Sequence, residues 1–80
     1  MRCHPRALNA EQHHILTYAL LGDQDEPWRN QYVSEIGDCG LTERMVQMGL
    51  LRHHRDVPGY RCYHVTQRGA DAVGLWLPYD

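Results

Sequence analysis

The sequence of 80 residues contains no lysine, no phenylalanine and a single serine, and no apolar run approaches the ~18 residues that a membrane-spanning helix needs. Its three cysteines, Cys3, Cys39 and Cys62, form no CxxC pair, so neither a disulfide framework nor a zinc site with paired thiols is indicated. The N-terminal stretch carries charge but lacks the apolar segment of a secretion signal. We therefore expect a cytoplasmic protein with free thiols and no membrane contact.

Because lysine is absent, all eight basic residues other than histidine are arginines, which stay charged and bind carboxylates or phosphates in a two-pronged geometry. Between residues 11 and 43, seven acidic residues accompany Arg29 as the only arginine. Between residues 44 and 68, five arginines accompany Asp56 as the only acid. The first half of the chain should therefore repel a polyanion, and the second half should attract one.

The pattern of residues 9–22 predicts a helix from about residue 10 to 21. Asn9 suits the N-cap position, and Gln12 lies three residues later, as in a capping box. The apolar residues that recur at helical spacing are Ile15, Leu16, Ala19 and Leu20. Gly22 should end this helix.

Two further helices are predicted before residue 50. Tyr32, Val33 and Ile36 occupy the i, i+1 and i+4 positions of a short second helix, which the GDCG stretch ends. The inner face of a third helix consists of Leu41, Met45, Val46 and Met48. Gly49 fits the position after that helix, because glycine adopts the left-handed cap without strain.

The stretch LLRHHRDVPGYRCYHV predicts a β-hairpin. Pro58 and Gly59 suit the two central positions of a type II turn. Alternation along the second strand predicts inward-facing side chains for Tyr63 and Val65, and it places Cys62 and His64 on the other side.

Thr66 is predicted to cap a last helix that carries Ala70, Val73 and Leu77. The order of three helices, a hairpin wing and a C-terminal helix resembles a winged helix, most clearly in LTERMVQMGLLRHH and YHVTQRGADAV, over roughly residues 8–75. The resemblance implies a single α/β (α+β) domain over residues 1–80, with 1–7 and 78–80 expected to be flexible. The expected core is Ile15, Leu16, Ala19, Leu20, Val33, Ile36, Leu41, Met45, Val46, Leu50, Val65 and Val73.

The stretches RNQYVSEI, MVQMGLL and HVTQRGADA also resemble small proteins carried by bacteriophages and prophages. Such proteins include operator-binding regulators and anti-CRISPR proteins. This resemblance favours an anti-CRISPR function, in which the chain blocks target-DNA engagement by binding a host CRISPR surveillance complex through protein–protein contacts. The alternative is a small winged-helix transcriptional regulator that binds DNA.

Two sets of residues are candidates for binding a partner. The hairpin set is Arg52, Arg55, Arg61 and Tyr60, residue types that are enriched at interface centres and that also suit nucleic-acid backbones. The competing set is acidic and precedes Trp28: Asp23, Asp25 and Glu26. Its carboxylates could imitate the phosphates of a nucleic acid.

For the DNA-binding alternative, the expected contact residues are Arg44, Gln47, Arg52 and Arg55. The nearby acids Glu35, Asp38 and Glu43 oppose the phosphate field, because the second and third helices would present them together. Duplex binding should then be weak at physiological salt.

No catalytic arrangement stands out, since the chain has one serine and no phosphate-binding glycine loop. The adjacent histidines of the pairs 13–14 and 53–54 point in different directions, which does not suit a metal site. We therefore expect no enzyme, no metal and no other cofactor. The apolar stretch GLWLPYD leaves two alternatives: a homodimer through the C-terminal helix, with Trp76 and Leu77 at the interface, or a monomer in which the stretch folds back on its own core.

Overall fold

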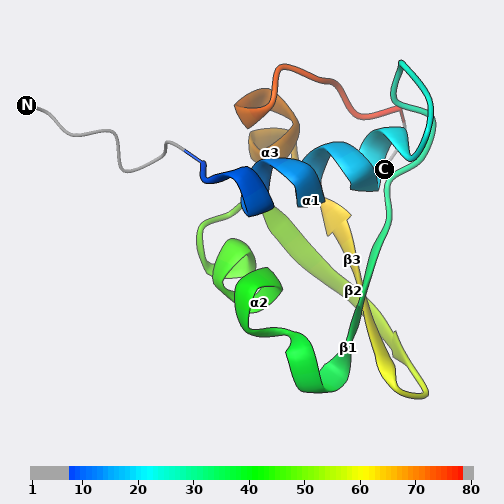
Figure 1. Cartoon of the computed structure of the whole chain (residues 1–80), viewed down its shortest axis with the longest axis vertical. Helices are drawn as coiled ribbons and strands as arrows, with labels where there is room; N and C mark the ends of the chain where they lie inside the picture. Colours follow the sequence, from blue (N-terminus) through cyan, green and yellow to red (C-terminus); the bar gives the residue numbers. More distant parts are fainter. Residues whose placement is uncertain (1–7, 79–80) are drawn as a thin grey trace, which may run out of the picture.

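The structure, a computed structural model, describes residues 8–78. Its elements follow the order α1 (Ala10–Leu21), β1 (Tyr32–Glu35), the 3-10 turn η1 (Ile36–Asp38), α2 (Gly40–Gln47), β2 (Leu51–Val57), β3 (Tyr60–Val65) and α3 (Gln67–Ala72). Within this range, three α-helices and one three-stranded antiparallel sheet form a small α+β fold (Figure 1). Of the ends expected to be flexible, residues 1–7 and 79–80 lie outside the described residues.

The first helix, α1, begins and ends as its sequence predicts. The Asn9 side chain accepts a hydrogen bond from the Gln12 N–H at 2.8 Å, and the Gln12 side-chain oxygen accepts one from the Asn9 N–H at 3.2 Å. This reciprocal pair satisfies two N–H groups that the helix itself leaves free. At the other end, Gly22 adopts a φ of 59° and donates its N–H to the C=O of Tyr18.

The predicted second helix is wrong, because Tyr32–Glu35 forms strand β1 and only the short turn η1 follows it. β1 pairs with β3 in antiparallel register, with Tyr32 opposite Tyr63. Val33 is 43% exposed and Ile36 is 46% exposed, so the apolar spacing did not mark a buried helical face. Aromatic and β-branched residues favour strands, and pairing with β3 decides the conformation.

A buried side chain, that of Asn30, extends the pairing of β1 with β3. Its amide nitrogen donates to the C=O of Val65 at 3.1 Å, and its oxygen accepts from the N–H of Val65 at 2.6 Å. The two bonds imitate a pair of backbone groups and satisfy polar atoms that are buried from water. The N-terminal end of β1 is therefore fixed by a side chain.

The hairpin forms as predicted, and the sheet order is β1-β3-β2. Gly59 has a φ of 84°, which the third position of a type II turn requires. A register shift between His53 and Arg55 sets an additional β2 residue against β3, as in a β-bulge. Cys62, which was expected to face away from the core, is buried beside this irregularity, and only His64 of the predicted outer pair stays partly exposed.

The helix before the hairpin, α2, matches the predicted third helix, and Gly49 follows it with a φ of 81°. Thr66 caps α3 by accepting a hydrogen bond from the Gly69 N–H at 3.0 Å. However, α3 ends at Ala72, so the prediction that it continues to residue 77 is wrong. Gly74 has a φ of 72°, a conformation typical of helix ends.

Residues 73–78, the last that the structure describes, consequently form no helix through which two copies could pair. Trp76 is 52% exposed, whereas Leu77 is half-buried and packs against the core. A homodimer that uses Trp76 stays a prediction, and it would have to form through this non-helical stretch.

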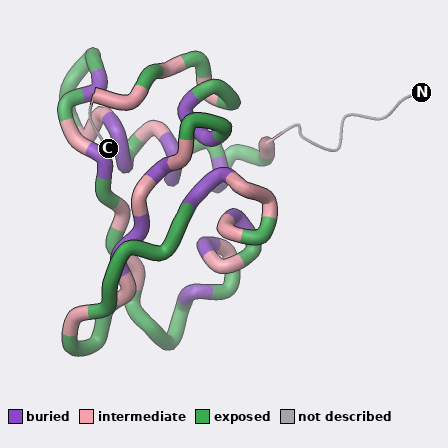
Figure 2. The backbone as a smooth tube through the Cα atoms, turned by 180° about the vertical axis from the view of Figure 1, so that it is seen from behind, coloured by how far each residue is buried: buried purple, intermediate pink, exposed green. Residues whose placement is uncertain are grey.

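The core lies between α1, α2 and the helix-facing side of the sheet. Most of the expected members are buried or pack at its rim, but Val33 and Ile36 are wrong because both belong to the exposed edge region of β1 and η1. Core residues that the prediction omitted are Leu51, Tyr63 and Ala70. Figure 2 shows the contrast between this buried centre and the exposed hairpin.

Candidate binding surfaces

The hairpin–α2 surface consists of five residues that the sequence assigned to binding: Arg44, Gln47, Arg52, Arg55 and Tyr60. All five are exposed. Arg44 and Gln47 come from α2, whereas Arg52 and Arg55 come from β2, which packs against α2. Tyr60 follows the hairpin turn and is 43% exposed. Tyr63 and Arg61 bind Glu43 of α2 from one face of the hairpin. By the register of the strands, Arg52, Arg55 and Tyr60 point to the opposite face, so the hairpin–α2 surface takes side chains from both sides of the hairpin.

Arg61, the remaining hairpin candidate, already binds two carboxylates of its own chain. Its Nε and Nη2 donate to the two oxygens of Asp56 at 2.9 and 3.2 Å, and its Nη1 donates to Glu43 at 3.3 Å. The bonds from Arg61, followed by that from His53, lower the pKa of Asp56 to about 2. We call Arg61, Asp56 and Glu43 the Arg61 cluster. It joins the hairpin to α2, and it directs the guanidinium of Arg61 toward carboxylates of its own chain.

The Arg61 cluster continues into the core through a tyrosine. The Tyr63 hydroxyl donates to Glu43 at 2.6 Å and accepts from the Thr42 hydroxyl at 3.0 Å. The bond from Tyr63 is the main cause that lowers the pKa of Glu43, and burial is the main cause that raises the pKa of Tyr63. Glu43 therefore stays ionised, and its charge is directed toward groups of its own chain.

This arrangement corrects the acidic docking face that was expected to oppose DNA. Glu35 lies on edge strand β1, and Asp38 ends the short 3-10 turn η1 just before α2, so the two acids do not share a second α-helix as predicted. Glu43 is on α2, but Arg61 and Tyr63 bind its carboxylate. The reason for the difference is the strand that replaces the predicted second helix.

The outer side of the hairpin also carries a pair of stacked histidines. The rings of His54 and His64 lie 4.1 Å apart with an interplanar angle of 19°. Arg52 pairs across the strands with His64, and burial, His54 and Arg52 all lower the pKa of His64. His64 is therefore neutral near pH 7, and Arg52 supplies a fixed positive charge beside it.

The acidic candidates Asp23, Asp25 and Glu26 are exposed in the loop between α1 and β1. Sequence analysis missed the contacts of Arg29, at the end of the same loop. Its guanidinium lies 4.7 Å from the ring centre of Tyr18 and 5.4 Å from that of Trp28, and it donates to the Tyr18 C=O at 2.7 Å. Cation–π contacts with two rings hold Arg29 against the loop.

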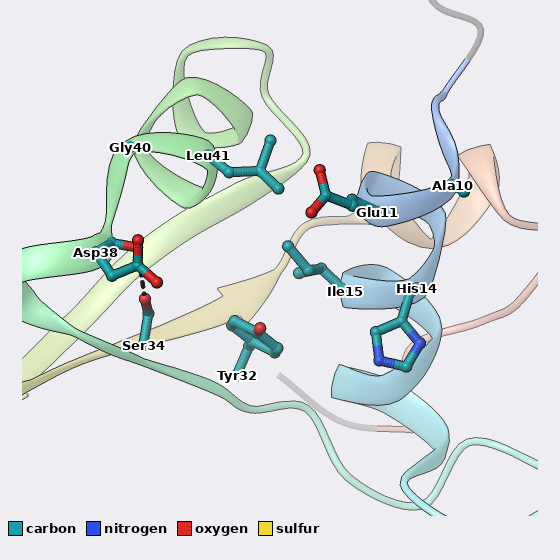
Figure 3. A pocket seen from close by; sticks show the side chains of 9 residues that line it. All are labelled: Ala10, Glu11, His14, Ile15, Tyr32, Ser34, Asp38, Gly40 and Leu41. Carbon is teal, nitrogen blue, oxygen red and sulfur yellow. Dashed lines mark hydrogen bonds between the residues drawn. The ribbon is translucent and has the colours of Figure 1, made fainter.

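Sequence analysis also did not indicate an open hollow of about 540 Å³ between α1, β1 and the start of α2 (Figure 3). We call it the α1–β1 hollow. Its polar lining comes from Glu11 and His14 of α1, Ser34 of β1 and Asp38 of η1, and Tyr32 lies between them. The hollow depends on β1 being a strand, so a helical interpretation of this segment could not predict it.

Comparison of the chain with protein-family models, curated proteins and solved structures finds no match. Residues 8–78 contain no group of three or more histidine, cysteine or acidic side chains arranged to hold a metal ion, and Cys39 and Cys62 are free thiols. In the same range, no helix is long and apolar enough to cross a membrane. The geometry of the surfaces is therefore the basis on which a function can be argued.

Proposed function

We propose that this chain is a small winged-helix-type regulator that binds duplex DNA through the hairpin–α2 surface. The observation that carries the proposal is the Arg61 cluster, in which one arginine binds both Glu43 and Asp56 and reduces their two negative charges to one. The three exposed arginines of the surface, Arg44, Arg52 and Arg55, outweigh the single negative charge that the cluster retains. A surface of this sign attracts the phosphate backbone.

The arrangement of α2 and the hairpin supports the winged-helix interpretation. α2, with Gly49 just after its end, leads directly into β2, and the capped α3 closes the fold after β3. Gln47 is an exposed residue of the type that can read base edges, whereas arginines on the hairpin suit phosphate contacts. We therefore assign base recognition to α2. The hairpin contacts the phosphate backbone and so positions the protein on the duplex.

Fluorescence anisotropy with a random-sequence DNA duplex tests the proposal over salt concentrations from about 50 to 200 mM. With three arginines as phosphate contacts, we expect the logarithm of the affinity to fall against the logarithm of the salt concentration with a slope of about −3. The variant Asp25→Asn with Glu26→Gln should change the affinity by less than about twofold, because these residues lie outside the surface. Failure to bind the duplex at the lowest salt concentration would overturn the proposal.

The second candidate function is the anti-CRISPR inhibitor that blocks target-DNA engagement. It is favoured by the exposed carboxylates of Asp23, Asp25 and Glu26, which are free to imitate phosphates. Inhibition by this route should survive Arg52→Ala with Arg55→Ala but not charge reversal of Asp25 and Glu26 to lysine. Binding of a purified CRISPR surveillance complex, measured with both variants, separates this function from direct DNA binding.

A further inference from the structure

The outer edge of β1 has unused backbone groups. β1 and β2 are the two edges of the sheet, because β3 lies between them. The Ile36 N–H donates to the Gly59 C=O at 3.1 Å, so the alternation of an antiparallel ladder directs the backbone groups of residues 32, 34 and 36 toward β3. The N–H and C=O of Val33 and the N–H of Glu35 then point to the open side, where another strand could pair with them. The Glu35 C=O already accepts hydrogen bonds from the Cys39 thiol and the Ser34 hydroxyl.

The α1–β1 hollow lies beside this edge and is acidic. Glu11 faces it from α1, and Asp38 faces it from η1, which follows β1 (Figure 3). Its remaining titratable groups are His14 and Tyr32, and burial raises the pKa of Tyr32, which therefore stays uncharged at neutral pH. Among the described residues, no arginine lines the hollow, so its two carboxylates provide an uncompensated negative charge.

A second hollow of about 500 Å³ lies along β1 beside the acidic one, and Tyr32 lines both. Its exposed apolar walls are Tyr18, Trp28 and Val33. Arg29 lines it too, but its guanidinium is held against the two rings and the Tyr18 C=O. The edge of β1 thus offers backbone groups for pairing, a negative hollow and a second hollow with aromatic walls.

We propose that this edge binds an extended, basic segment of a protein partner by strand addition, with an arginine or lysine of the segment received between Glu11 and Asp38. Backbone bonds to Val33 and Glu35 supply affinity, and side chains at alternate positions of the segment enter the two hollows. Two carboxylates that line the same hollow favour a cationic side chain over an acidic one.

A second copy of this chain fits the edge less well. Pairing of β1 with the same strand of another copy would place two acidic hollows and two Glu35 side chains along one junction. Like charges at such a junction are unfavourable. The acidic edge therefore points to a different protein as the occupant, and this inference does not depend on the proposed binding of DNA by the hairpin–α2 surface.

The probe for this site is a short fluorescent peptide that alternates arginine with valine. Wild-type protein should bind it measurably and should not bind the peptide in which glutamate replaces arginine. N-methylation of the peptide at alternate residues blocks strand pairing, so it should abolish binding. The amide signals of Val33 and Glu35 in nuclear magnetic resonance spectra should shift on addition of the unmodified peptide.

Two charge-matched variants decide where the peptide binds. Glu11→Gln with Asp38→Asn should weaken binding by about fivefold or more, whereas Asp25→Asn with Glu26→Gln removes the same charge from the loop and should change it by less than about twofold. Both variants should bind duplex DNA like the wild type. The inference is overturned if the peptide does not bind, if both variants weaken it equally, or if the N-methylated peptide binds as well as the unmodified one.

Discussion

The two edges of the sheet differ in charge and in the way they are fixed. The β2 edge carries Arg52 and Arg55, and the Arg61 cluster holds the hairpin to α2. The β1 edge is lined by acids, and Asn30 holds its beginning to β3. Because each edge repels a copy of itself, their charges discourage edge-to-edge association. The comparison also shows how one small sheet can present two surfaces that suit partners of opposite charge.

The largest effect that we expect comes from detaching the β1 edge. Asn30→Ala removes both bonds to Val65 and leaves a buried N–H and a buried C=O without partners, so the free energy of unfolding should fall by roughly 2–4 kcal/mol. Urea unfolding measures this change, and Gln31→Ala, at the exposed neighbouring position, should change it by less than about 0.5 kcal/mol. Equal stability of the two variants would mean that the Asn30 bonds do not fix β1.

A smaller effect is expected at the core end of the Arg61 cluster. Tyr63→Phe removes a buried hydroxyl that bonds both Glu43 and Thr42, so the free energy of unfolding should fall by about 1–2 kcal/mol. Tyr60→Phe is the matched control, because Tyr60 is exposed and no hydrogen bond of its hydroxyl contributes to the cluster. If both phenylalanine variants unfold at the same urea concentration, Tyr63 does not connect α2 to the hairpin.

Arg61→Gln tests whether Arg61 acts by neutralising carboxylates or by touching the nucleic acid. It should lower the melting temperature and weaken duplex binding by roughly three- to tenfold, because Glu43 and Asp56 regain their effect on the phosphates. Adding Glu43→Gln and Asp56→Asn to the same variant should restore most of the binding. No restoration would assign Arg61 to direct contact with the nucleic acid.

The smallest effect concerns the acid dependence of stability. Arg61 and His53 lower the pKa of Asp56 from 3.8 to about 2, so its ionised form stabilises the fold above pH 3.8 and this contribution is lost as the pH falls through about 2. Asp56→Asn should therefore flatten the stability profile between these two pH values, as measured by urea unfolding. An unchanged profile would mean that the Arg61–Asp56 bonds are not maintained in solution.

The parts of the fold that the sequence predicted depend on local signals. The Asn9–Gln12 capping box, Gly49, the Pro58–Gly59 turn and the Thr66 cap all act within a few residues, so α1, the end of α2, the hairpin and the start of α3 were predictable. β1 was not, because its conformation depends on β3, about thirty residues later in the chain. The extent of α3 was missed because the apolar residues after it pack on the core without a helix.

The candidate binding surfaces likewise combine features that local sequence predicts with features that depend on contacts between distant parts of the chain. Exposure of Arg52 and Arg55 follows from their place on an edge strand, which the hairpin pattern already implied. The bonds of Arg61 to Glu43 required knowledge of how α2 packs on the hairpin, and that packing has no signature in the sequence. The α1–β1 hollow was missed for a similar reason, since a helix had been predicted where β1 lies.

The most direct test of the proposed function is the salt dependence of duplex binding by Arg52→Ala with Arg55→Ala. Both side chains are exposed and belong to the hairpin–α2 surface, so the variant should melt at the wild-type temperature. Anisotropy titrations from about 50 to 200 mM salt should give a slope that is less steep than that of the wild type by about 2, together with weaker binding at every salt concentration. A slope and an affinity equal to those of the wild type would contradict the account, because the hairpin arginines would then have no part in holding the duplex.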